Sequence, residues 1–250
     1  MKKDSFDIKC AVASGGVAAL DRAFGILSSF VTEDEILTLA ELARRTGLYK
    51  STILRLLISL EHGGFTRRLS DGRYTIGPEP LRLAHIYQDS YRIRHIIQPI
   101  LQDLCRDSGE ASSFYVREGN SRVVLYRVES ARAARRAVHE GERLPVECGA
   151  SGKVLMAFAT PQNEGLEEVR ENLYSVSFGE RDAATASASA PAFGNCQELK
   201  GALTLSGPRE RFTPERVRVA CRILLAAASR ASAALGGNPA LFSRGLERLI

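Results

Sequence analysis

The segment between Thr38 and Tyr74 constrains the fold of this chain most, because it contains two short amphipathic helices separated by a glycine turn. Residues 38–45 carry leucine and alanine at helical spacing, with Thr38 placed to cap the first turn. Gly47 can adopt the left-handed conformation that ends a helix. The second helix is predicted over 51–60, and its apolar face consists of Ile53, Leu56, Leu57 and Leu60. Two helices joined in this way, the second with a polar and basic outer face, are typical of proteins that read the major groove of DNA.

A basic hairpin is predicted directly after the second helix. Residues 65–68 and 73–76 have strand character, and Asp71-Gly72 between them is a strong turn signal. From Thr38 to Thr75 the chain has seven basic and three acidic residues, a net charge of +4 out of a formal +5 for the whole chain. This concentration of charge favours nucleic acid as the partner, although a helix pair with a solvated basic face is the ordinary alternative. The predicted DNA-contact residues are Thr38, Lys50, Ser51, Thr52, Arg55, Arg68 and Arg73.

Length and composition restrict the other classes of protein. The 250 residues suffice for two domains with their own cores. No run of about eighteen apolar residues occurs, and the basic N-terminus is followed by acids instead of an apolar stretch, so neither a membrane span nor a signal peptide is predicted. The five cysteines are widely spread and form no CxxC pair, which predicts reduced thiols in a cytoplasmic protein. Neither a metal site nor a cofactor is expected.

The rest of the chain predicts an α+β protein whose second domain contains an antiparallel sheet. Helices are expected over 17–31, 80–90, 95–105, 152–159, 160–173 and 214–235, and strands over 112–117, 122–128, 134–139 and 199–206. The predicted organisation is a winged helix-turn-helix at 16–78, a linker helix at 79–94, a ligand domain at 95–236 and a tail at 237–250. Residues 183–192 are ambiguous, because their alanine and serine content is also that of a flexible linker.

The order of several short motifs resembles the IclR family of bacterial transcription regulators, from about Val17 to Leu235. The motifs in the first part are Leu20-Asp21-Arg22-Ala23, Thr46-Gly47-Leu48, Lys50-Ser51-Thr52, Arg55-Leu56-Leu57 and Gly72-Arg73-Tyr74-Thr75-Ile76-Gly77. Those in the second part are Arg143-Leu144-Pro145, Ala150-Ser151-Gly152-Lys153-Val154-Leu155 and Leu205-Ser206-Gly207-Pro208. The resemblance implies a winged helix-turn-helix joined by a linker helix to a GAF-like α/β ligand-binding domain. It also implies dimers, often paired into tetramers, that bind double-stranded DNA at pseudo-palindromic operators and respond to a small aromatic or aliphatic carboxylate.

The resemblance also places an effector pocket. Carried over by position, its residues are Ala150, Ser151, Gly152, Ser187, Thr204, Ser206 and an acid that is either Glu180 or Asp182. It recasts residues 186–193 as a strand, where the small side chains suggest a roomier or less ordered pocket than the family's bulkier residues form. The residues themselves support part of this site. A helix that begins near Ser151 offers unpaired N–H groups to a carboxylate, and Thr204 and Ser206 lie on the same side of a strand. A capped helix and a strand with ordinary hydroxyls is the alternative.

Enzyme chemistry is not predicted. Residues 149–153 resemble part of a phosphate-binding loop, but Glu147 stands where a glycine is required and Val154 replaces the hydroxyl residue that holds magnesium. Cys148 is interpreted as a small apolar side chain instead of a nucleophile, because none of the four histidines is placed beside it by the sequence. The competing function is a ligand-sensing adaptor whose winged helix mediates protein–protein contacts. Salt-dependent DNA binding distinguishes the two.

Overall fold

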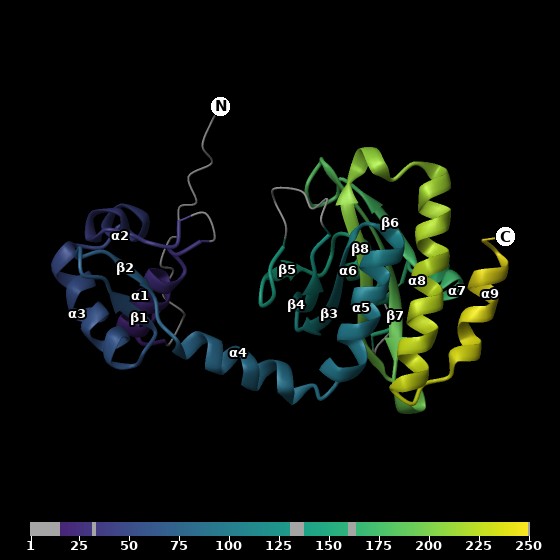
Figure 1. Ribbon diagram of the computed structural model, residues 1–250, viewed down its shortest axis with the longest axis horizontal. Helices are drawn as coiled ribbons and strands as arrows, with labels where there is room; N and C mark the ends of the chain where they lie inside the picture. The colour runs from purple at the N-terminus through teal and green to yellow at the C-terminus, as the bar shows by residue number, and fades with distance from the viewer. Residues whose placement is uncertain (1–15, 32–33, 131–137, 160–163, 250) are drawn as a thin grey trace. The chain divides into compact units, whose positions relative to one another are not determined.

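The computed structural model describes residues 16–31, 34–130, 138–159 and 164–249. They form two compact units, one ending at Tyr87 and the other beginning at Gln88. The long helix α4 (Glu79–Ser90) contains the boundary between them (Figure 1). None of the helices in the described ranges is long and apolar enough to cross a membrane.

The first unit is a winged helix-turn-helix. Its helices are α1 (Ala18–Leu27), α2 (Leu39–Thr46) and α3 (Lys50–His62), and its wing is the hairpin of β1 (Thr66–Arg68) and β2 (Tyr74–Ile76). The three helices and the wing enclose a small core of Ile26, Leu37, Leu42, Ile53, Leu57, Leu60 and Tyr74. Helix α1 ends four residues before the predicted end, and the apolar face predicted for it is largely exposed: Val17, Leu20, Phe24 and Val31 are all accessible to solvent.

The second unit contains a six-stranded antiparallel sheet in the order β5-β4-β3-β8-β7-β6. The predicted hairpin is β3 (Ala111–Glu118) and β4 (Ser121–Val128), and the predicted late strand is β8 (Leu199–Pro208). Strands β5 (Arg143–Pro145) and β6 (Ser175–Phe178) were not predicted. The strand predicted over 134–139 lies mostly outside the described residues, and Val138 and His139 are not part of a strand.

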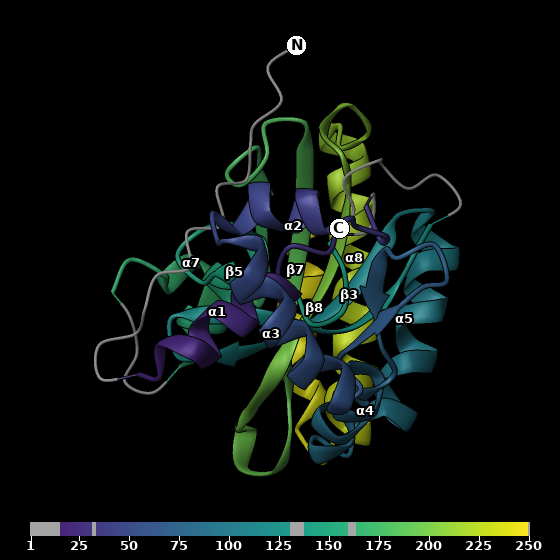
Figure 2. The ribbon, with the colours of Figure 1, turned by 90° about the vertical axis from the view of Figure 1, so that its left-hand side faces the viewer.

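The ambiguous alanine- and serine-rich segment is strand β7 (Thr185–Phe193), paired with β6 on one side and β8 on the other. Figure 2 shows β7 and β8 side by side along their length. Ala188, Ala190 and Ala192 point into the core, while Ser187 and Ser189 alternate with them. The small core-facing residues contact a similarly small stripe on α8, which includes Ala227, Ala228 and Ala231. The flexible-linker interpretation is therefore wrong, because the segment has the alternation of a two-sided strand.

Helices cover both faces of the sheet. Helices α5 (Arg94–Ser108) and α8 (Pro214–Ala234) pack on one face and form the larger core, and α6 (Ala150–Ala157) and the short α7 (Glu167–Asn172) lie over the other (Figure 1). The start predicted for α7 at Thr160 lies outside the described residues, and residues 164–166 are not helical. The tail forms a turn at Pro239–Phe242 and α9 (Ser243–Glu247), and Phe242 is buried in the larger core. Polar residues of the sheet lie below α6, and a cavity is present between them and this helix.

Candidate functional site

The helix-turn-helix is held by local hydrogen bonds. The backbone N–H of Glu41 donates to Thr38 Oγ1 at 3.2 Å, and the N–H of Thr38 donates to Glu41 Oε2 at 2.8 Å, which makes a reciprocal capping box. Hydrogen bonds from Thr38 lower the pKa of Glu41, so the cap is ionised at neutral pH. Gly47 ends α2 in the left-handed conformation with φ 70°. The Thr38 hydroxyl is therefore engaged in starting α2, and its contact with DNA stays a prediction.

Helix α3 presents a polar face to solvent. Lys50, Ser51 and Arg55 are exposed and Thr52 is half-buried, while Ile53 and Leu57 anchor the opposite side in the core. Neither Lys50 nor Arg55 forms an ion pair with another described residue. A basic helix face without internal counter-charges is suited to phosphate oxygens and base edges.

The wing contributes two further arginines, and their surroundings differ. Arg73 forms a 2.7 Å ion pair with Asp71, and both side chains are about half exposed. The guanidinium of Arg68 lies over the ring of Tyr74 at 5.9 Å. An exposed ion pair stabilises a protein little, so Arg73 can exchange Asp71 for a phosphate at low cost. A third basic side chain, Arg45, instead pairs with Asp34 and donates to Ser29 O, and so fixes the entry into α2.

The second unit contains a cavity of about 70 Å³ between α6 and the sheet. Five of the residues expected from the resemblance line it: Ser151, Glu180, Ser187, Thr204 and Ser206. The other three, Ala150, Gly152 and Asp182, are not among its lining residues. Asp182 instead accepts the N–H of Ala184 at 3.1 Å and closes the turn before β7. Glu180 is therefore the acid that the structure places at the cavity.

The strand register arranges the hydroxyls of the sheet in two rows. Ser113, Thr204, Ser189 and Ser175 lie directly opposite one another across four neighbouring strands, and Ser206, Ser187 and Ser177 form the next row. Residues that pair in this way share one face of the sheet. Ser189 Oγ lies 2.9 Å from Thr204 Oγ1 and donates to Leu203 O, so the deeper row is partly bonded to itself. The second row has three hydroxyls along the floor of the cavity.

The start of α6 was expected to offer unpaired N–H groups to a ligand, but a carboxylate of the protein binds there. The carboxylate of Glu180 accepts the N–H of Gly149 at 2.8 Å and pairs with Lys153 at 2.5 Å. Burial opposes ionisation of Glu180, but the hydrogen bonds from Lys153 and Gly149 lower its pKa overall. An internal carboxylate thus already occupies one donor next to the helix N-terminus. A ligand carboxylate has to use the remaining first-turn N–H groups or another cation.

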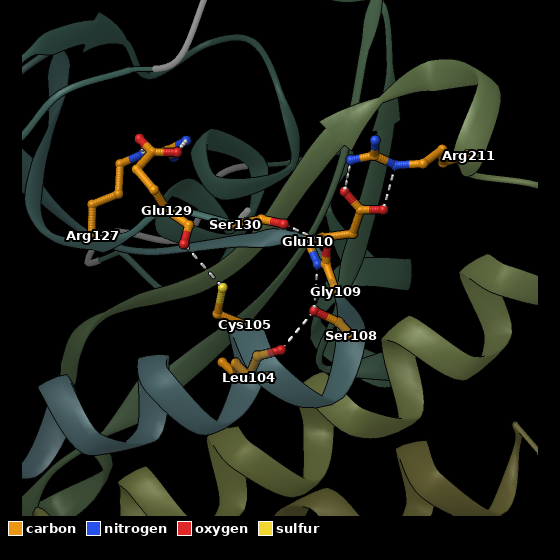
Figure 3. A network of polar contacts seen from close by, with 9 residues as sticks. All are labelled: Leu104, Cys105, Ser108, Gly109, Glu110, Arg127, Glu129, Ser130 and Arg211. Atoms are coloured by element: carbon orange, nitrogen blue, oxygen red, sulfur yellow. Dashed lines mark hydrogen bonds and ion pairs between the residues drawn. The ribbon is translucent and has the colours of Figure 1, made fainter. Parts of the chain in front are cut away.

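Four arginines that the sequence analysis did not select also line the cavity: Arg122, Arg127, Arg181 and Arg211. Arg127 is held by Glu129, with Nε at 2.5 Å from Oε1, and by Ser113, whose hydroxyl accepts from Nη1 at 2.8 Å. Arg211 is bound by the buried Glu110 through two parallel hydrogen bonds at the end of α5, as Figure 3 shows. Arg122 lies at the start of β4, directly before an apolar run. A charged residue at an inward-facing position of a strand is the sequence signal that could have identified it.

Metal-ligating side chains and thiols are the other groups of the chain that could carry chemistry. Within the ranges that the structure describes, no group of three or more His, Cys, Asp or Glu side chains could hold a metal ion. Burial raises the pKa of Cys221 to about 12, so this thiol stays protonated. Burial also raises the pKa of Cys105, whose sulfur lies 3.4 Å from Glu129 O (Figure 3).

Comparisons with known proteins match both units. A family model described as the IclR helix-turn-helix domain matches residues 19–70, and one described as bacterial transcriptional regulator IclR C-terminal matches 85–164 and 163–233. The HTH-type transcriptional regulator KipR of Bacillus subtilis is 28% identical over 206 residues, 72% of this chain and 82% of that protein. The transcriptional repressor IclR of Escherichia coli is 25% identical over 92% of this chain and 94% of its own length.

Solved structures have the same fold. The Thermotoga maritima IclR crystal structure matches with a TM-score of 0.72 at 24% identity, over 87% of this chain and 98% of that one. An IclR homolog from Microbacterium hydrocarbonoxydans, complexed with 4-hydroxybenzoate, matches with a TM-score of 0.71 at 22% identity, over 87% of this chain and 98% of that one.

Proposed function

The chain belongs to the IclR family of bacterial transcriptional regulators, and we propose that it binds an operator through α3 and the wing and changes this binding when a small carboxylate fills the cavity under α6. The observation that carries the proposal is that one chain has both parts: a solvent-facing basic helix without internal counter-charges and a cavity lined by hydroxyl and guanidinium groups. In this reading the protein is a cytoplasmic binding protein and not an enzyme.

The DNA-binding form is proposed to be a dimer. Exposed apolar side chains at the start of and within α1 are Val17, Leu20 and Phe24, which are 66%, 53% and 54% exposed, and α4 adds Leu81 and Ile86. Apolar faces of this kind suit a second copy of the same unit. A two-fold dimer sets two reader helices about 34 Å apart, one helical turn of DNA, which predicts a pseudo-palindromic operator.

The effector is proposed to be a small organic acid. The bound 4-hydroxybenzoate of the Microbacterium homolog supports this class of ligand. Ser187 and Ser206 on the cavity floor can donate to carboxylate oxygens, and Ser151 lies in the first turn of α6 above them.

A hydrogen-bond chain supports a route from the cavity to the linker helix. The N–H of the cavity residue Arg127 donates to Glu140 Oε1 at 2.8 Å, and Glu140 Oε2 accepts from Gln88 Nε2 at 2.7 Å. Gln88 belongs to α4, is buried, and also donates to Leu125 O, while Tyr126 donates its hydroxyl hydrogen to Gln88 O. A displacement of β4 by a ligand would therefore be transmitted to the last turns of α4.

Gln88→Leu is expected to uncouple the two activities. The variant removes the side-chain hydrogen bonds that Gln88 makes with Leu125, Glu140 and Arg94. The effector should therefore bind as before but change operator affinity by less than about twofold, where allosteric coupling ordinarily gives about 5- to 150-fold. Fluorescence anisotropy with operator DNA, with and without effector, measures this. Asp89→Asn, an exposed neighbour on the same helix, is the control and should keep the full response. A normal response in Gln88→Leu would contradict the route.

The experiment that tests the function is an anisotropy titration of the full chain against the DNA that flanks its own gene, from about 50 to 200 mM salt. Binding through several phosphate contacts should weaken by roughly 10³ or more over this range. Small carboxylates added at fixed salt should then shift the curve. Absence of DNA binding at every salt concentration would reject the regulator and favour the ligand-sensing adaptor.

A further inference from the structure

Arg122 is the most unusual charged residue of the cavity because it is almost completely buried, with 3% of its surface exposed. Its Nη1 donates to Pro145 O at 2.5 Å and to Cys148 O, and its guanidinium lies over the ring of Tyr115 at 5.7 Å. These contacts hold the turn that leads into α6. The Nε atom is buried and has no hydrogen-bond partner.

No carboxylate of the described residues forms an ion pair with this guanidinium. Among the other cavity cations, Arg127 is paired with Glu129 and Arg211 with Glu110, while Arg181 is exposed to solvent. The cavity acid Glu180 is paired with Lys153. The described residues offer Arg122 no ion pair. Residues 131–137, 160–163 and 250, which complete the unit, include neither aspartate nor glutamate. Every acidic side chain of this unit is thus described, and none is paired with Arg122.

A buried charge without a counter-ion is costly, and two carbonyl dipoles offset only part of that cost. Tyr115, whose ring lies under the Arg122 guanidinium, also lines the cavity. Burial raises the pKa of this phenol, while Arg122, Arg127 and Arg181 act in the opposite direction. Arg122 is thus the cavity arginine whose charge is both buried and without a counter-ion among the described residues.

We propose that Arg122 is the binding residue for the carboxylate of the effector, and that this carboxylate supplies the counter-ion which no described side chain supplies. This inference rests on the proposed function and deepens it, because the residues expected from the resemblance offer hydroxyl and N–H donors but no cation. A guanidinium already fixed by Pro145 and Cys148 loses little entropy on binding, which favours a bidentate contact to a planar carboxylate.

The cavity volume directs the choice of probes. A cavity of roughly 150 Å³ holds benzene in a protein core, and the present cavity is about 70 Å³. Short aliphatic acids are therefore expected to fit without rearrangement, and benzoate only if the cavity widens. The probes are acetate, propionate, lactate, succinate and benzoate, each beside its neutral amide, at constant ionic strength.

Binding of each probe to the full chain is measured by thermal shift and calorimetry. At least one acid should bind saturably, its amide at least tenfold more weakly, and Arg122→Met should weaken the acid at least tenfold. Arg117→Gln, which changes an exposed arginine of β3 outside the cavity, should bind like the wild type. Arg122→Lys keeps the charge and should retain part of the affinity. If Arg122→Met does not fold, the Arg122→Lys variant and the comparison of acid with amide still test the proposal.

The proposal is overturned if no acid of the panel binds, if amide and acid bind equally, or if the acid binds both Arg122 variants as tightly as the wild type. The last result would make Arg122 purely structural. Operator binding measured on the same samples distinguishes failure of the Arg122 proposal from failure of the proposed regulator function. Operator binding without any carboxylate binding would reject the role of Arg122 and leave the regulator intact, whereas carboxylate binding through Arg122 without operator binding would reject the regulator alone.

Discussion

Arg55→Ala is expected to weaken operator binding by more than about 1 kcal/mol, roughly a fivefold or larger rise in Kd. Arg55 is exposed in the middle of the polar face of α3, and no described residue competes for its guanidinium as an ion-pair partner. Its contact with a base edge or a nearby phosphate would therefore be lost outright. Anisotropy with operator DNA at fixed salt measures the change, and circular dichroism checks that α3 is intact.

Two comparisons sharpen this experiment. Arg216→Ala removes an exposed arginine from α8 in the other unit and should leave the affinity unchanged. If Arg55 reads a base, Arg55→Ala should also reduce the preference for operator over unrelated DNA. If it contacts only phosphate, both affinities should fall together and the salt slope should decrease by about one. An affinity equal to that of the wild type would remove Arg55 from the DNA-contact set.

Gly152→Ala is expected to abolish the effector response and to destabilise the second unit by about 1–3 kcal/mol, the usual range for overpacking. A Cβ atom at this position would lie 2.1 Å from Val146 O and 2.7 Å from Arg122 Nη1. The nearer atom belongs to the backbone, so the turn before α6 has to move. Movement there displaces Arg122 and Ser151 together. Urea unfolding and effector titration measure the two effects.

Gly194→Ala is the matched control. The three atoms nearest to its added Cβ all belong to the side chain of Lys200, which is long enough to turn away. The control should keep the effector response and lose little stability. DNA binding should survive in both variants, because the winged helix has its own core. A Gly152→Ala protein that responds normally to the effector would show that the geometry of this turn does not control the cavity.

The winged helix could be predicted well because its signals are local. The Thr38 cap, the left-handed Gly47 and the Asp71-Gly72 turn each act within a few residues, and the structure contains all three features. Helix α1 shows where local periodicity stops being sufficient. The predicted spacing of apolar residues does form a helix, but Ile26 enters the core and Phe24 is exposed. Periodicity defines a face and does not identify what covers it.

The ligand domain was harder to predict for the same reason. Strand β7 has the composition of a linker, and the period-two alternation of alanine and serine is meaningful only once α8 and the cavity lie on its two sides. The resemblance grouped Ser187, Thr204 and Ser206, and the register across β7 and β8 brings all three to the same cavity. No local pattern indicated that Glu180 binds the N–H of Gly149, because 31 residues separate them.

The amino-acid sequence by itself determined the helix-turn-helix, the position of its basic charge and the α+β class, since caps, turns and amphipathic spacing are properties of neighbouring residues. Only the tertiary structure decided which charges meet. It buried Arg122 without an acidic partner among the described residues, and it paired Arg211 with Glu110 and Glu180 with Lys153, residues that lie far apart along the chain. Electrostatic balance depends on distances through space, which the order of residues along the chain does not contain.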